Sequence, residues 1–247
     1  MRILNCCVGL ALLVHGAAGA MASVVPTPAD LARSVAEARA AITAVDGTVL
    51  SEKVRGAGIP LMESRHAWAP GKIRVERARM VGSREARFIA TFDGKTFWVA
   101  QSLTRILVKR GEPDGHFVRD GFGLFELMAF FPDVAGLEPK RSRDLQHLLA
   151  RRGVAVRDAM EAIGDAECVV VDVPAPPGGS RWTIWIDPAA SYQPRRQVAS
   201  RDDGTEILRI EIEEFLEVEG VHVPIRATRV SPQLGGEAAI EYRMHVP

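Results

Sequence analysis

Alternating apolar and polar residues fill most of this 247-residue chain, and this pattern constrains the fold more than any other feature. A period of two is typical of a strand that buries one face. Pro70-Gly71 and Asp93-Gly94 stand between successive segments and are good hairpin turns. Because no helical pattern separates these segments, they predict sequential antiparallel strands without the crossovers that parallel strands require. In the first half of the chain the predicted strands are residues 48–55, 62–68, 73–79, 87–92, 97–101 and 105–109.

The same pattern resumes at residue 154 and predicts a second series of strands. Asp203-Gly204 and Gly220 mark turns within it, and the last strand alternates cleanly from residue 238 onward. The APPGG at 175–179 is at most a hairpin loop, so no linker divides the chain and the two series can be halves of one sheet. The second series comprises residues 154–160, 167–173, 181–186, 195–200, 207–216, 221–230 and 238–246.

Three segments are predicted to be helices, and one of them is unusual. Residues 28–45 and 143–152 carry apolar residues at helical spacing. Residues 122–131, FGLFELMAFF, have Glu126 as their only charge and are stopped by Pro132. A helix that is apolar nearly all round is buried or faces something apolar. It therefore either plugs the mouth of the curled sheet or packs as ordinary core.

Together these elements predict a mainly β (α+β) fold. We expect a curved antiparallel half-open β-barrel of about 11–13 strands, with about three helices covering its concave face.

The first 20 residues have the features of a cleaved secretory signal. Arg2 precedes a short apolar run at 6–14, and small residues stand at Ala18 and Ala20. The run is too short to span a bilayer. We therefore expect a signal peptide at 1–20 and a single exported domain at 21–247.

The cysteines predict neither a lipid anchor nor a disulfide. A lipidated cysteine follows the apolar run of a signal, whereas Cys6 and Cys7 precede it and leave with it. Only Cys168 remains, in the strand-like segment ECVVVDV. We interpret Cys168 as a buried structural thiol and not as a nucleophile.

Charge and motifs exclude several function classes. The 31 basic and 31 acidic residues cancel, which leaves no electrostatic footprint for nucleic acid. The chain has no HExxH, GxSxG, P-loop, GxGxxG or CxxC motif. We therefore expect no enzyme activity, no catalytic residue, no cofactor and no bound metal. The histidines outside the signal are scattered without metal-ligand spacing, at His66, His116, His147, His222 and His245.

The acidic run IEIEEFLEVE at 210–219 is interpreted as the solvated face of a strand. Glu211 and Glu213 alternate with inward apolar residues, and a basic strand with Arg195 and Arg196 precedes it across a turn. Opposite charges that face each other across a hairpin are ordinary sheet support.

Several motifs, in their order, resemble the periplasmic lipoprotein-carrier (LolA/LolB-like) superfamily. WAPGKIRVE at 68–76 is followed by the hairpin IATFDGKTFWVA at 89–100, and FGLFELMAFF then takes the place of a helical lid. WTIWIDPAASYQPRRQVASRDDGTE, from residue 182 onward, and EGVHVPIRATRV are similar to the superfamily's outer membrane lipoprotein-sorting relatives. The resemblance covers most of the chain after the signal.

The resemblance implies an apolar cavity, under the helical lid, that holds acyl chains. The residues expected to line the cavity or form the lid are aromatic or large and apolar. Trp182 is favoured over Trp185 because it is in phase with Ile184 and Ile186. The complete set is Trp68, Phe88, Phe92, Phe97, Trp98, Phe122, Phe125, Leu127, Met128, Phe131 and Trp182.

We therefore expect a periplasmic carrier or binding protein for a lipid or an acylated protein. Its partners would be acyl chains and an inner- or outer-membrane donor or acceptor protein, and the chain would be a monomer. The dedicated carriers have an Arg before the Pro of the Trp-Pro segment, which holds the lid shut; here that position is Ala69. This departure indicates a divergent relative that carries another lipid or serves one export system. The alternative is a regulatory module that senses lipid or lipoprotein and binds a membrane protein.

Overall fold

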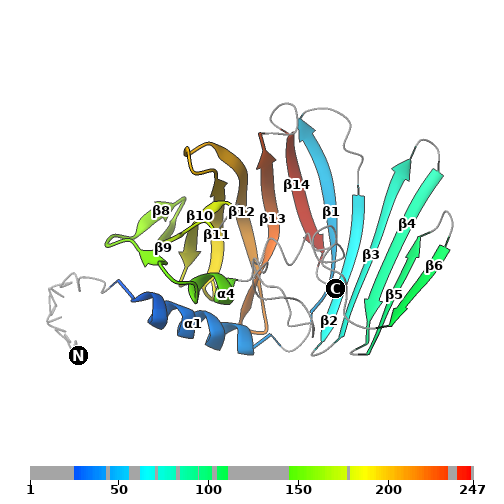
Figure 1. Ribbon diagram of the computed structural model, residues 1–247, viewed down its shortest axis with the longest axis horizontal. Helices are drawn as coiled ribbons and strands as arrows, with labels where there is room; N and C mark the ends of the chain where they lie inside the picture. Colours follow the sequence, from blue (N-terminus) through cyan, green and yellow to red (C-terminus); the bar gives the residue numbers. More distant parts are fainter. Residues whose placement is uncertain are drawn as a thin grey trace, which may run out of the picture.

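Most of the chain forms one antiparallel sheet that curls strongly in space (Figure 1). The computed structural model describes residues 25–42, 45–55, 62–69, 72–81, 84–93, 95–101, 105–110, 145–176, 179–232 and 238–245. Over these residues the sheet has 14 strands in the order β6-β5-β4-β3-β2-β1-β14-β13-β12-β11-β10-β9-β7, with β8 paired to β9 at the side. The strands are β1 (Val45–Arg55), β2 (Met62–Ala69), β3 (Lys72–Val81), β4 (Arg84–Phe92), β5 (Thr96–Gln101), β6 (Arg105–Arg110), β7 (Ala155–Val156), β8 (Glu161–Ile163), β9 (Ala166–Val173), β10 (Arg181–Asp187), β11 (Gln193–Ser200), β12 (Glu206–Val218), β13 (Val221–Ser231) and β14 (Ala238–His245).

The first strand joins the two predicted series into one sheet. β1 pairs with β2 on one side and with β14 on the other, so β1–β6 and β7–β14 meet at the middle of the sheet. Within each series the neighbours are antiparallel hairpin partners, as the meander pattern predicts. β6 and β7 are the two edge strands of this order. Among the described strands they do not pair with each other, so the sheet is open.

Two helices are described, and both are shorter than the sequence pattern predicts. α1 (Pro28–Ala40) begins with Thr27 as its N-cap, whose hydroxyl accepts from the Asp30 backbone N–H at 3.2 Å. It stops before residue 45 because Val45 already pairs with Trp68 in the sheet. α4 (Leu145–Leu149) ends before the predicted end at residue 152, and residues 143–144 lie outside the described residues. Neither described helix is long and apolar enough to cross a membrane.

The predicted strand at 154–160 is the clearest difference from the sequence pattern. Only Ala155–Val156 pairs with β9, and the chain then bends and returns as the unpredicted strand β8. Arg157 explains the break, because its guanidinium turns to Asp172 on β9 and to Glu161 on β8. The described residues therefore hold one strand more than the 13 that the pattern marks out.

One face of the sheet, here called the inner face, packs against both helices. Leu31 and Val35 of α1 and Leu145, Leu148 and Leu149 of α4 are buried in one cluster with sheet residues. Cross-strand partners share a face. The registers of the paired strands therefore carry this inner face continuously from β9 through β14 and β1 to β4. Each fully buried aliphatic side chain contributes about 1.5–3 kcal/mol.

Candidate functional site

The inner face of β9–β12 is a filled apolar core. Val171, Ile184 and Ile210 are fully buried there and belong to the cluster that holds α1 and α4. Figure 1 shows both helices beside this half of the sheet, away from β3–β6. Gln197 is a polar residue within this core, buried between Ile184 and Ile210 in the register. This half of the inner face is therefore packed by the protein's own helices.

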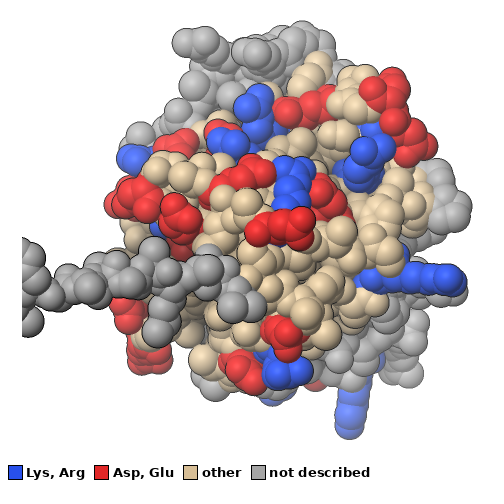
Figure 2. All heavy atoms as spheres, turned by 90° about the vertical axis from the view of Figure 1, so that its left-hand side faces the viewer, with Lys and Arg blue, Asp and Glu red and all other residues tan. Residues whose placement is uncertain are grey.

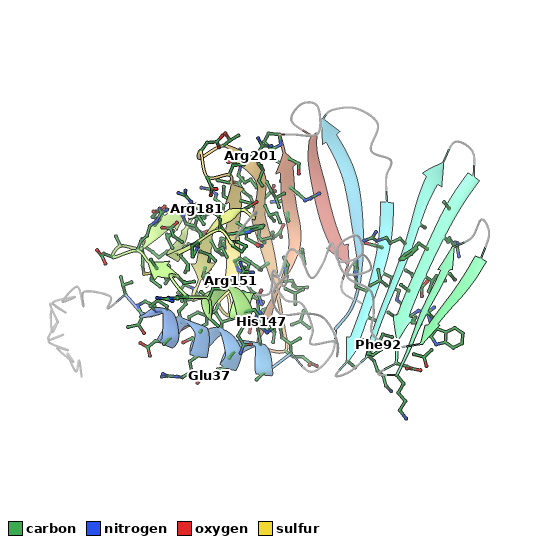
Figure 3. All side chains as sticks on the ribbon, viewed as in Figure 1. Glu37, Phe92, His147, Arg151, Arg181 and Arg201 are labelled. Atoms are coloured by element: carbon green, nitrogen blue, oxygen red, sulfur yellow. The ribbon has the colours of Figure 1, made fainter. Side chains whose placement is uncertain are left out.

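The inner face of β2–β4 combines apolar and polar side chains. Val75 and Ala90 are fully buried opposite each other, and Phe92 is 5% exposed at the end of β4. Figure 3 shows Phe92 at that end of the sheet, far from α1 and α4. Beside these residues, Ser64 and His66 are also buried. This half of the inner face thus differs in chemistry from the filled core.

Ser64, His66 and Arg77 form a polar cluster on this face. His66 Nε2 and Ser64 Oγ lie 3.0 Å apart and share a hydrogen bond. Arg77 pairs in register with Ser64 and with the half-buried Phe88, so its side chain starts from the same face. Burial, followed by the charge of Arg77, lowers the pKa of His66 from 6.5 to about 3. His66 is therefore neutral at neutral pH.

Sequence reasoning did not single out this cluster, although a signal for it exists. Ser64 and His66 occupy alternate positions of one predicted strand, in phase with each other. The alternation places them on one face, but the polar pattern of residues 62–68 does not say which face is buried. Only the pairing of His66 with buried Val75 resolves this.

The structure brings some of the predicted aromatic residues to the inner face. Phe92 is buried and Phe88 is partly buried, and both pack on the core cluster. Trp182 is buried at 8% exposure with Ile184 and Ile186, as its phase predicts, while Trp185 stands on the opposite face.

Other predicted residues lie elsewhere or outside the described residues. Trp98 pairs with Thr91 on the face opposite Phe92 and is 44% exposed, so it does not join the inner face. Trp68 pairs with Ile73 in register, and Phe97 pairs with Phe92. The lid segment lies outside the described residues, and with it Phe122, Phe125, Leu127, Met128 and Phe131.

The opposite, outer face of β8–β12 is a network of paired charges. Arg157 contacts Asp172 at 2.9 Å and Glu161 at 2.7 Å. Trp185 donates from Nε1 to Glu161 at 2.8 Å, and the Arg196 guanidinium lies 5.4 Å from the centre of the Trp185 ring. Figure 2 shows the resulting mixture of acidic and basic side chains on this side of the molecule. These pairs are half exposed, so each supports the sheet by only about 0–1 kcal/mol.

The acidic run on β12 belongs to the same outer face. Arg196 Nε lies 2.8 Å from Glu211, its partner in register, and Arg226 Nε lies 2.8 Å from Glu213. The interpretation of this run as sheet support is confirmed for Arg196, whereas Arg195 bonds elsewhere, to Asp187. No group of three metal-ligating side chains comes together within the described residues.

A hollow of about 390 Å³ lies at the outer edge of β8–β11, beside a buried ion pair. Asp187 accepts from Arg195 Nε at 2.8 Å and from the backbone N–H groups of Ala189 and Ala190 at 2.8 and 3.2 Å. These bonds hold the turn between β10 and β11, where Ser191 and Tyr192 take left-handed backbone angles. The hollow is lined by Met160, Asp165, Ala166, Glu167, Asp187, Pro188, Ala189 and Arg195.

Cys168 is a structural thiol, as the sequence predicts. Its side chain is fully buried and Sγ contacts the Ala166 carbonyl at 3.8 Å. Burial raises the pKa of Cys168 to about 11, so the reactive thiolate is scarce at neutral pH.

Comparisons with known proteins show the fold of the chain. No protein-family model matches it, and no curated protein matches its sequence. A DUF1329 family protein from Desulfovibrio piger is similar over 88% of this chain and 90% of its own, with 10% identity and a TM-score of 0.57. A LolA superfamily protein from Nitrosomonas europaea is similar over 90% and 92%, with 14% identity and a TM-score of 0.51. A domain from Vibrio parahaemolyticus, named for outer membrane lipoprotein sorting, matches over 86% and 89%, with 11% identity and a TM-score of 0.50. The chain therefore has a LolA-like fold.

Proposed function

We propose that this chain is a carrier or binding protein for a lipid or an acylated protein. The observation that carries the proposal is the continuous inner face of an open, curled sheet, which runs from a helix-filled half to a half that bears Phe88 and Phe92. The LolA-like fold supports it, because two of the similar structures are named for the LolA superfamily and for lipoprotein sorting. An acyl chain that buries about ten CH₂ groups gains at most ~8 kcal/mol, which corresponds to micromolar binding.

The proposed ligand surface is the inner face together with the apolar segment 122–131. Phe88, Phe92 and Trp182 lie on the inner face. Trp68 and Phe97 are proposed to join them from their register positions, and Phe122, Phe125, Leu127, Met128 and Phe131 are proposed to form the lid. Trp98 is left out of the proposed surface because it is exposed on the other face.

The proposed setting is the periplasm, after removal of a signal peptide at 1–20, with no lipid anchor. Residues 21–247 would act as a single monomeric domain. A soluble carrier needs a donor and an acceptor, so the proposal includes an inner- or outer-membrane protein at each end of its route.

Native mass spectrometry of protein purified from periplasm without detergent tests the function directly. The expected result is a mass excess that organic extraction removes and that identifies the class of the carried lipid. A clean apo mass, with no uptake of added phospholipid or acylated peptide, would refute the proposal.

The lid is tested by charges placed in the apolar segment. Phe125→Asp or Leu127→Asp should abolish lipid uptake while the far-ultraviolet circular dichroism of the sheet persists. Leu216→Asp is the matched control, because Leu216 is an apolar residue of β12 that is 44% exposed. Loss of the fold in the first two variants would assign the segment to ordinary core.

A further inference from the structure

The two halves of the sheet carry opposite charge, although the whole chain is neutral. Residues 62–110, which form β2–β6 and their turns, include 11 basic and 4 acidic residues, a net charge of +7. Residues 145–247, which contain α4 and β7–β14, include 11 basic and 16 acidic residues, a net charge of −5. Figure 1 shows β3–β6 at one end of the sheet and β8–β10 at the other. The β2–β6 half therefore attracts an anionic partner.

Two cations at the turns of this half have no acidic partner. Lys72 begins β3 and Lys95 directly precedes β5; both are exposed, and neither makes an ion pair within the described residues. Arg74 differs, because it contacts Glu76. Backbone N–H bonds lower the pKa of the nearby Asp93 most and the charge of Lys95 least, so Asp93 holds its own turn and is not tightly paired. The ammonium groups of both lysines can therefore meet an outside anion.

An exposed tryptophan lies on the same surface as these charges. Trp98 pairs with Thr91, which pairs with Arg74, so the three share the outer face of β3–β5. Lys72 is two residues before Arg74 on β3 and belongs to that face as well. Trp98 is 44% exposed. A large apolar ring and unpaired cations are thus combined on the face opposite Phe92.

This combination fits a bilayer surface better than a protein surface. Trp is enriched at membrane–water interfaces because its ring is amphipathic, and a Lys side chain extends its ammonium group to anionic head groups. Interfaces between proteins are also enriched in Trp, but they are depleted in Lys. The pairing of Trp98 with Lys72 and Lys95 therefore favours an anionic membrane over an acidic partner protein.

We propose that the outer face at Lys72, Lys95 and Trp98 docks on the surface of an anionic phospholipid bilayer. The positive β2–β6 half attracts the bilayer, and the Trp98 ring enters its head-group region. The docking surface lies on the face opposite Phe88 and Phe92, so it goes beyond the proposed carrier function and does not depend on it. For a carrier, such docking would bring the curled sheet to the membrane that supplies or receives its lipid.

Co-sedimentation of the purified protein with vesicles tests the docking. One set of vesicles consists of phosphatidylcholine alone, and the other of equal parts of phosphatidylcholine and phosphatidylglycerol. Each basic residue near an anionic surface contributes about fivefold to binding, so the two lysines alone give a preference of about 25-fold for the anionic vesicles. In 1 M salt the preference should largely disappear, because the Debye length falls to about 3 Å.

Charge variants locate the surface. Lys72→Gln combined with Lys95→Gln should weaken binding to the anionic vesicles about 25-fold. Arg152→Gln combined with Arg181→Gln is the matched control. These two arginines are exposed in the acidic half and also make no ion pair within the described residues. The control removes the same charge and should bind within about twofold of the wild type, because its charges lie more than a Debye length from the docked face.

A second pair of variants tests the tryptophan. Trp98→Ala should weaken binding about tenfold, since docking that covers half of the exposed ring removes roughly 50 Å² of apolar surface from water. Leu216→Ala is the matched control, because Leu216 is also 44% exposed but lies on β12. All of these side chains are exposed, so the variants should unfold at the temperature of the wild type.

The outcomes separate docking from carriage. Equal binding to both kinds of vesicle, or equal losses in the lysine and arginine variants, would overturn the docking surface. No binding to anionic vesicles would overturn it in favour of an acidic partner protein. A carried lipid in a protein that ignores vesicles would overturn docking alone, whereas docking by a protein with a clean apo mass would overturn the carrier function alone.

Discussion

The buried His66 gives the protein a specific dependence of stability on pH. In the unfolded chain His66 has its ordinary pKa of 6.5, whereas burial and the nearby Arg77 lower it to about 3 in the folded state. Between these values the unfolded chain binds a proton that the folded protein does not. The stabilisation is therefore fully present above pH 6.5 and is lost as the pH falls from 6.5 towards 3.

The magnitude follows from the two pKa values. The slope in this interval is about 1.4 kcal/mol per pH unit, so this one group should lower the free energy of unfolding by about 2 kcal/mol between pH 7 and pH 5. His66→Asn removes the titrating group while keeping a polar side chain beside Ser64. The variant should be less stable at pH 7 but should lose about 2 kcal/mol less than the wild type on going to pH 5.

Urea unfolding followed by circular dichroism at pH 7 and pH 5 measures this difference. The carboxyl groups titrate equally in both proteins, so their contributions cancel in the comparison. His147→Asn, at an exposed position of α4, is the matched control and should behave as the wild type does. Equal losses in wild type and His66→Asn would refute the burial of a neutral imidazole.

Three further predictions concern other parts of the molecule. Asp187→Asn should lower the free energy of unfolding by about 2–4 kcal/mol, because the buried Asp187 bonds Arg195 and two backbone N–H groups. Asp172→Asn, in an exposed pair with Arg157, should lower it by less than about 1 kcal/mol. Urea unfolding measures both, and equal costs would contradict the assigned role of Asp187. In a chain that begins at residue 21, Cys168 should resist a thiol reagent until urea is added, and rapid labelling of the native protein would contradict its burial. Ala69→Arg should slow ligand release in a stopped-flow exchange assay, because it restores the Arg that the resemblance associates with a closed lid, and an unchanged rate would count against that role.

Local periodicity predicted the strands well because each strand of this sheet buries one face. It also separated Trp182 from Trp185, since adjacent residues point to opposite faces. It failed at 154–160, where Arg157 bonds to Asp172, 15 residues away in the sequence. It also overextended α1, because pairing with Trp68 draws Val45 into the sheet. In both places a long-range partner outweighed the local pattern.

The candidate site was harder to predict than the fold, for a related reason. The apolar segment at 122–131 and the aromatic residues can be recognised in the sequence because their composition is unusual. Ser64, His66 and Arg77 are ordinary surface residues by composition, and only the register of β2 and β3 shows that they share a face with buried Val75. A polar site on the inner face of a sheet depends on which face curls inward, and polar alternation alone does not encode that choice.

The motifs on which the resemblance rests are explained by hydrogen bonds that hold backbone turns, and they do not require a ligand. The Asp of IWID is Asp187, which caps the next turn and bonds Arg195 of the PRR segment. The two DG turns are held in the same way, because Asp93 accepts from the Lys95 and Thr96 backbone N–H groups and Asp203 accepts from Thr205. Such residues specify the hairpins of a LolA-like sheet whatever the sheet carries, so agreement in these motifs predicts the fold without identifying the cargo. The chemistry of the cargo has to be inferred from the inner face instead, where the apolar Phe88 and Phe92 lie beside the polar Ser64, His66 and Arg77.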